Sequence, residues 1–157
     1  MTTQQIFGLQ VALSFVVYGL VAKWYVGPRL AALPLGAALA PLLVLHALRH
    51  LGMVFLVPTV VGPSVPASFA MPAAYGDLLA GLLALAALIA LRGAWSVAIP
   101  IVWVFNVVGL LDLVNAFYQG LSADVQLGAG YYIPTFIVPA LVITHVMIFR
   151  MLLRHPR

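Results

Sequence analysis

Five long apolar segments constrain the fold of this chain more than any other feature of its sequence. Each is close to the length of about 20 residues that an α-helix needs to cross the hydrocarbon core of a bilayer. Of the 157 residues, 65% are hydrophobic and only 6% are charged, whereas soluble domains usually carry about 25% charged residues. We therefore predict an all-α integral membrane protein, a single domain over residues 1–157, built as a five-helix transmembrane bundle. The predicted spans are residues 5–26, 38–61, 73–91, 95–118 and 132–153.

The connections between the spans carry turn and loop signals. Residues 62–72 read GPSVPASFAMP, and none of these prolines suits a helix interior because proline lacks the backbone N–H. Residues 119–130 read QGLSADVQLGAG, a polar and glycine-containing stretch that includes Asp124 and predicts a second loop. Arg92 and Gly93 predict a tight turn between the third and fourth spans.

The basic residues predict the orientation of the bundle. With five spans, all of them except Arg49 fall on one side, because they lie in the first connection, the third connection and the C-terminal segment. Cytoplasmic segments carry the excess of Lys and Arg, so we expect the N-terminus outside and the C-terminus in the cytoplasm, in a cell inner membrane. Seven scattered cations do not form a nucleic-acid footprint, and the lipid bilayer is the expected partner. These cations are Lys23, Arg29, Arg49, Arg92, Arg150, Arg154 and Arg157.

The third span presents a face of small residues. Asp77, Ala80, Gly81, Ala84 and Ala87 recur at helical spacing. Small side chains allow helix backbones to approach closely, so this face is expected to meet another helix.

Polar residues within the spans are the candidate functional residues. Ionisable groups at bilayer depth cost about 2.5 to 3.5 kcal/mol each and usually mark a function. We expect those of this chain to gather in one interior cluster, built on the second span and closed by the third, fourth and fifth. The candidates are His46, Arg49, His50, Asp77, Asn106, Asp112, Asn115 and His145.

The stretch HALRHLG, residues 46–52, supplies three of these candidates. At about 100° per residue, Arg49 lies about 60° behind His46 and His50 about 40° ahead of it, so all three should project from one side of an α-helix. Arg49 then needs an anion inside the bundle. We predict that it pairs with Asp112, Asp77 or both.

Several hypotheses fit such a cluster. A buried ion pair can simply fix the register of helices. His46 and His50 at i and i+4 could begin a metal site, but Arg49 lies between them and the chain has no Glu to act as a base, so no metal is predicted. Haem b is a hypothesis for the cofactor, with axial ligands from His46 or His50 and from His145. The absence of cysteine excludes disulfides and thiolate chemistry.

As its function we predict binding of a hydrophobic small molecule or cofactor, with Arg49 as an anion clamp and the histidines as ligating or hydrogen-bonding groups. One alternative is a membrane-embedded enzyme that performs acid–base chemistry, such as an isomerisation, on a lipid-like substrate. Others are a proton-linked transporter and a structural subunit of a larger membrane complex. Many transporters are built from two internal repeats. A chain of five spans does not divide into two equal repeats, so a homodimer would have to supply the symmetry.

Overall fold

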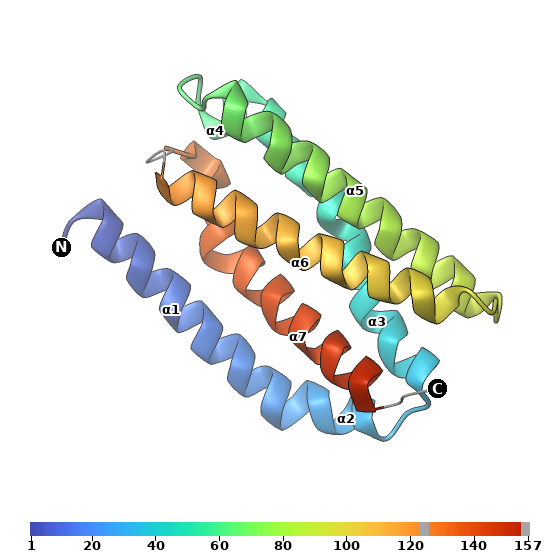
Figure 1. Ribbon diagram of the computed structural model, residues 1–157. Helices are drawn as coiled ribbons and strands as arrows, with labels where there is room; N and C mark the ends of the chain where they lie inside the picture. Colours follow the sequence, from blue (N-terminus) through green and yellow to red (C-terminus); the bar gives the residue numbers. More distant parts are fainter. Residues whose placement is uncertain (123–125, 155–157) are drawn as a thin grey trace.

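A computed structural model describes residues 1–122 and 126–154, and every regular element within these ranges is helical. Several helices join end to end into longer rods (Figure 1). The first rod consists of α1 (Thr3–Val21), the π-helical turn η1 (Ala22–Val26) and α2 (Gly27–Ala31). The second consists of α3 (Leu35–Ala47) and the 3₁₀ helix η2 (Leu48–Leu56), followed by the short α4 (Pro58–Val61). The others are α5 (Ala67–Arg92), α6 (Ala98–Ser122), and α7 (Val138–Arg154), which is preceded by η3 (Gly128–Tyr131) and η4 (Ile133–Ile137).

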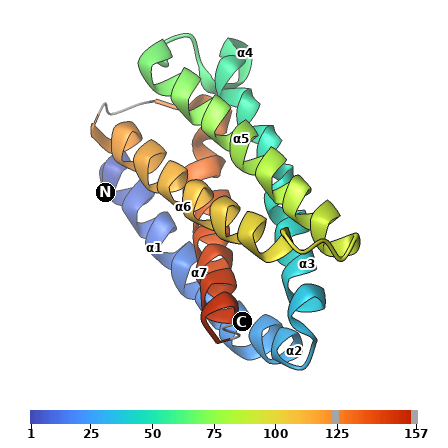
Figure 2. The same ribbon diagram turned by 45° about the vertical axis from the view of Figure 1, so that its right-hand side comes forward.

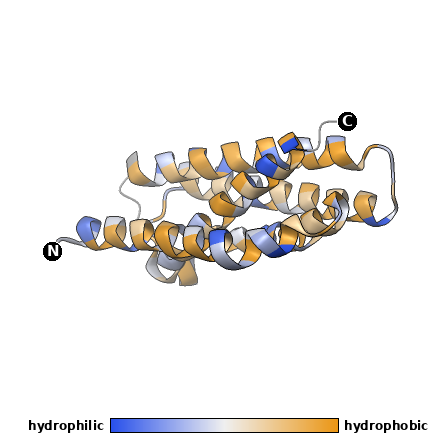
Figure 3. Ribbon diagram, turned by 90° about the horizontal axis from the view of Figure 1, so that it is seen from below, coloured by the Kyte–Doolittle hydropathy of each residue, from blue (hydrophilic) through white to orange (hydrophobic). Residues whose placement is uncertain are grey.

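Five helical segments in the described chain are long and apolar enough to cross a membrane, which is the number predicted. Figure 3 shows that hydrophobic residues predominate along the helices of the bundle. Their boundaries differ from the predicted spans, since the second segment already ends at Leu56. The segments are Thr3–Ala31, Leu35–Leu56, Ala67–Arg92, Ala98–Leu121 and Gly128–Arg154.

The start of α5 corrects the prediction of a loop over residues 62–72. Pro72 lies inside this helix, in its second turn, and Pro66 is its N-cap. A proline there removes only the hydrogen bond to the carbonyl of Ser68, while the rest of the helix stays bonded. The predicted turn at Arg92 and Gly93 is confirmed, because α5 ends at Arg92. Asp124 and Arg157 lie outside the described residues.

The helices form one bundle in which α1 is the outermost. Figures 1 and 2 agree that α1 runs beside α7, while α3 and α5 lie on the far side and α6 crosses between them. None of the residues Thr3–Val21 is buried. The chain reverses direction at each connection, so α2, the end of α5 and the end of α7 meet at one end of the bundle (Figure 1). Among the described cations, all except Arg49 lie at or near that end: Lys23 in η1, Arg29 in α2, Arg92 at the end of α5, and Arg150 and Arg154 in the last turns of α7.

Two apolar clusters fill the interior, one toward each end. The first includes Leu39, Leu43 and Phe105. The second includes Phe55 and Phe69. The segment 46–52 lies between them along the second rod, so the polar residues occupy the middle of the bundle.

The predicted small-residue face of α5 is confirmed as a packing face. Ala80, Ala84 and Ala87 are fully buried. At Gly81, an added Cβ would lie 3.2 Å from the backbone nitrogen of His50. The two rods therefore approach almost to backbone contact, which brings Asp77 opposite Arg49.

Candidate functional site

Arg49 is the centre of the buried polar site. Its Nε donates to Asp77 Oδ1 at 2.8 Å, and its Nη2 donates to Asp112 Oδ2 at 2.6 Å. The Arg49 side chain is 1% exposed, whereas those of Asp77 and Asp112 are 12% and 15% exposed. The predicted pairing is confirmed with both carboxylates. We call Arg49, Asp77 and Asp112 the ion-pair cluster.

The remaining guanidinium nitrogen, Nη1, is bound by α6 and α7. It donates to the carbonyl of Gly109 at 2.9 Å and lies 3.4 Å from His145 Nε2. Arginine has no acceptor, so His145 Nε2 must carry the lone pair. Its proton then sits on Nδ1, which donates to Asn106 Oδ1 at 2.7 Å, while the Asn106 amide donates to the carbonyl of His145 at 3.1 Å. These contacts define a neutral His145 with one tautomer.

His46 extends the polar site away from the carboxylates. Its Nε2 lies 3.0 Å from Thr144 Oγ1, whose own hydroxyl donates to the carbonyls of Ala140 and Leu141. The His46 ring also packs on those of His145 and Phe105, with centroids 4.1 and 5.0 Å away. Its Nδ1 has no hydrogen-bond partner among the described residues.

The haem hypothesis fits this geometry poorly. A bis-histidine haem places the macrocycle between two imidazole rings, but the rings of His46 and His145 are in direct contact with each other. Within the described parts of the chain, no group of three or more His or Asp side chains is arranged to hold a metal ion.

His50 does not join the site, contrary to the prediction that it shares a face with His46 and Arg49. It is exposed, and its Nδ1 lies 3.0 Å from the carbonyl of Ala47. The reason is the 3₁₀ helix η2, which has about three residues per turn. Arg49, Gly52 and Phe55 are its buried residues, so the inward face repeats every third residue and His50 turns away.

Asn115 also lies outside the site. It is exposed on α6, where Gln119 Nε2 donates to its Oδ1 at 3.0 Å. On a regular α-helix, each step of three residues turns about 60° around the axis. Gly109 is buried, Asp112 is partly buried and Asn115 is exposed, so Asn115 lies beyond the edge of the inward face. Asn106, six residues before Asp112 on the same helix, is fully buried.

Glycines make room for the ion-pair cluster, and sequence reasoning did not identify this role. An added Cβ would overlap Asp77 Oδ2 at Gly52 and Asp112 Oδ1 at Gly76. At Gly109 it would lie 2.9 Å from Arg49 Nη1. Glycines within three residues of a charged residue inside apolar helices were the available signal, because only a missing Cβ lets a charged side chain approach the neighbouring backbone so closely.

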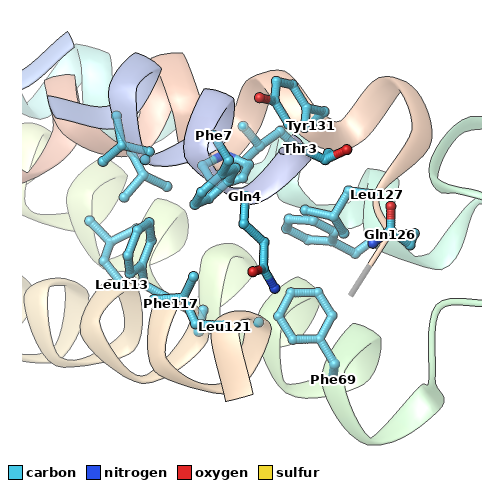
Figure 4. A pocket seen from close by; sticks show the side chains of 18 of the residues that line it. Thr3, Gln4, Phe7, Phe69, Leu113, Phe117, Leu121, Gln126, Leu127 and Tyr131 are labelled. Atoms are coloured by element: carbon cyan, nitrogen blue, oxygen red, sulfur yellow. The ribbon is translucent and has the colours of Figure 1, made fainter. Parts of the chain in front are cut away.

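A large cavity opens beside the cluster, between α1 and α6, and we call it the α1–α6 cavity. Its volume is about 980 Å³, and Asp77 and Asp112 are among its lining residues. Figure 4 shows Gln4 reaching from α1 into the space between Phe117 and Phe69. Six aromatic side chains contribute to the walls: Phe7, Phe15, Phe55, Phe69, Phe117 and Tyr131.

The site is therefore divided into two layers. The two carboxylates reach the cavity, whereas Arg49, His46 and His145 lie behind them and do not line it. A molecule in the cavity would meet aromatic rings and carboxylates, not the guanidinium or the imidazoles.

The fold and the site define a class: an all-helical protein with five helices able to span a membrane and a buried ion-pair cluster beside an apolar cavity. The chain belongs to the family described as Domain of unknown function (DUF8737), whose model matches residues 6–153. No curated protein and no solved structure matches the chain.

Proposed function

We propose that this protein binds a hydrophobic small molecule within the membrane, in the α1–α6 cavity. The observation that carries the proposal is the cavity itself, which has a volume of about 980 Å³ and is lined by aromatic rings and two carboxylates. Binding sites for small molecules are typically cavities of about 300 to 1,000 Å³ with apolar walls and a few convergent polar groups.

The roles of the polar residues differ from those expected from the sequence. Arg49 is an internal partner of the carboxylates, since all three of its nitrogens are already bound to protein groups. His145 and Asn106 hold Arg49 in place from behind. Asp77 and Asp112 are then the groups that contact a ligand.

The proposed location is a cell inner membrane, with the N-terminus outside and the C-terminus in the cytoplasm. The clustering of the described cations at the end formed by α2 and the termini of α5 and α7 supports this orientation. The cavity then lies in the outer half of the membrane, because it is lined by the first residues of α1, such as Thr3 and Phe7.

A tryptophan at Gly8 tests the proposal. Gly8 lines the cavity, and an added Cβ there would meet nothing within 4 Å, so an indole can fill the cavity without a clash at its root. We expect Gly8→Trp to lower the affinity for N-phenyl-1-naphthylamine, an uncharged apolar reporter, by about tenfold or more. Native mass spectrometry of protein released from maltoside micelles counts the bound reporter.

Gly19→Trp is the matched control. Gly19 lies on the same helix with equally open surroundings but does not line this cavity, so its reporter binding should equal that of the wild type. Equal binding by all three proteins, or no binding by the wild type, would contradict the proposed function.

A proton-linked transporter is the second candidate. Polar contacts continue from the carboxylates through Arg49 and His145, and the His145 ring touches that of His46, which contacts Thr144. Thr144 lines a second cavity of about 350 Å³. The acid–base enzyme is less favoured, because neither buried histidine reaches the large cavity.

A further inference from the structure

The ion-pair cluster contains two acidic side chains and one basic side chain. Two carboxylates, Asp77 and Asp112, share the single guanidinium of Arg49. Within the described chain, Arg49 is the cation in contact with them, and His145 is neutral by its hydrogen bonds. A charge removed from water without a counter-charge is strongly destabilising, so a proton or a further cation must balance the second carboxylate.

The position of the excess charge points to the cavity. Arg49 binds one oxygen of each carboxylate and approaches from the interior, with a side chain only 1% exposed. The exposed parts of Asp77 and Asp112 belong to the wall of the α1–α6 cavity. A counter-charge brought by a ligand would therefore arrive opposite Arg49, with both carboxylates between the two cations.

The cavity walls suit an organic cation. Phe55 and Phe69 lie next to each other on the wall, with ring centroids 5.6 Å apart. On the α1 side, Phe7 contacts Phe117 and Tyr131, with centroid separations of 6.1 and 5.8 Å. Aromatic faces attract organic cations such as quaternary ammonium groups, most strongly where water is excluded.

From this geometry we infer that the ligand of the α1–α6 cavity is a lipophilic organic monocation, an amine or quaternary ammonium with an apolar body. The inference rests on the proposed function and specifies its ligand class. The ammonium group lies against Asp77 and Asp112, and the apolar body lies between α1 and α6. A phospholipid with an ammonium headgroup fits less well, because its phosphate would approach the same two carboxylates.

A competition experiment tests the charge of the ligand. The wild-type protein in maltoside micelles is first loaded with the uncharged reporter N-phenyl-1-naphthylamine. Either octyltrimethylammonium or its carbon isostere 2,2-dimethyldecane is then added in increasing concentration, and the reporter that stays bound is measured. The two competitors differ in charge but hardly in shape. We expect the concentration of the cation that displaces half of the reporter to be at least about tenfold lower than that of the isostere. The reason is that an ion pair at a poorly solvated site outweighs the cation's own loss of hydration.

Asp112→Asn tests which charge is responsible. The amide oxygen can still accept from Arg49, while the cluster becomes neutral. The ratio between the displacing concentrations of the isostere and the cation should therefore fall to about twofold or less, whatever the affinity of the variant for the reporter. Asn115→Ala, at an exposed position on the same helix, should keep the full preference. Phosphatidylcholine is added as a third competitor. Displacement by it at the cation's concentration would overturn the inference of a monocation, because a zwitterionic lipid headgroup would then supply the ammonium.

Two outcomes separate the inference from the proposed function. Equal displacement by the cation and its isostere in the wild type would overturn the inference, since a proton would then balance the second carboxylate, and the cavity would remain a binding site. No reporter binding in the wild type would overturn both. The wild-type comparison stands even if Asp112→Asn does not fold.

Discussion

At the scale of single residues, Arg49 connects three separate helices to the second rod. It contacts Asp77 on α5, Gly109 and Asp112 on α6, and His145 on α7. The sequence allowed its carboxylate partners to be predicted, because the chain contains only three acidic residues and one of them, Asp124, was expected in a loop. The carbonyl of Gly109 could not be predicted as a partner of Arg49, since this contact depends on how closely the helix backbones approach.

Arg49→Met removes the counter-charge and leaves two buried carboxylates facing each other. Breaking a buried pair in this way costs about 3 to 5 kcal/mol, so the free energy of unfolding in mixed micelles should fall by that order. Arg92→Met is the control, because Arg92 is exposed at the end of α5 and its loss should change stability by less than about 0.5 kcal/mol. An unfolding curve for Arg49→Met that matches the wild type would show that the pairs do not stabilise the fold.

At the scale of elements, the change from α-helix to 3₁₀ helix at Leu48 decides which polar residues enter the site. His46 belongs to α3 and Arg49 to η2. A continuous α-helix would have turned His46, Arg49 and His50 inward together. The tighter winding instead aligns Arg49, Gly52 and Phe55 on one face. Stretches of 3₁₀ helix within a longer helix often mark functional segments, and here the segment carries the centre of the ion-pair cluster.

The two histidines of HALRHLG should therefore differ in their importance for stability. His46 is fully buried against two rings, so His46→Ala should lower the free energy of unfolding by about 2 kcal/mol or more, through the cavity that it leaves. His50 is exposed, and His50→Ala should change it by less than about 0.5 kcal/mol. Both are measured by the same unfolding titration in micelles. Similar losses for the two variants would indicate a regular α-helix through this segment.

At the scale of the whole molecule, α1 gives the bundle its asymmetry. The other four rods enclose the apolar clusters and the ion-pair cluster, while α1 buries none of its own residues and packs along α7 and η4. One side of the α1–α6 cavity is thus formed by the least enclosed helix. The polar contacts of α1 with the bundle include the hydrogen bond that the Tyr131 hydroxyl donates to Gln10 Oε1, at 2.6 Å.

The proposed orientation can be tested with single cysteines, since the chain contains none. Ser64 precedes α5 and Ser96 follows it, so these two exposed serines lie at opposite ends of the bundle. In intact cells, we expect a membrane-impermeant maleimide to label Ser64→Cys at once and Ser96→Cys only after permeabilisation. The reverse labelling pattern would place the N-terminus in the cytoplasm.

The sequence by itself determined the helical class, the five apolar segments, the small-residue face of α5 and the pairing of Arg49 with acidic residues. These properties follow from composition and spacing. In an apolar chain with so few charges, the backbone N–H and C=O groups find hydrogen-bond partners within helices, and a buried charged side chain has few possible counter-charges. Only the tertiary structure decided that His50 and Asn115 lie outside the site, that Pro72 continues a helix and that a cavity separates α1 from α6. Each of these depends on local helix winding or on the distance between helices, and both are set by packing among residues far apart in the chain.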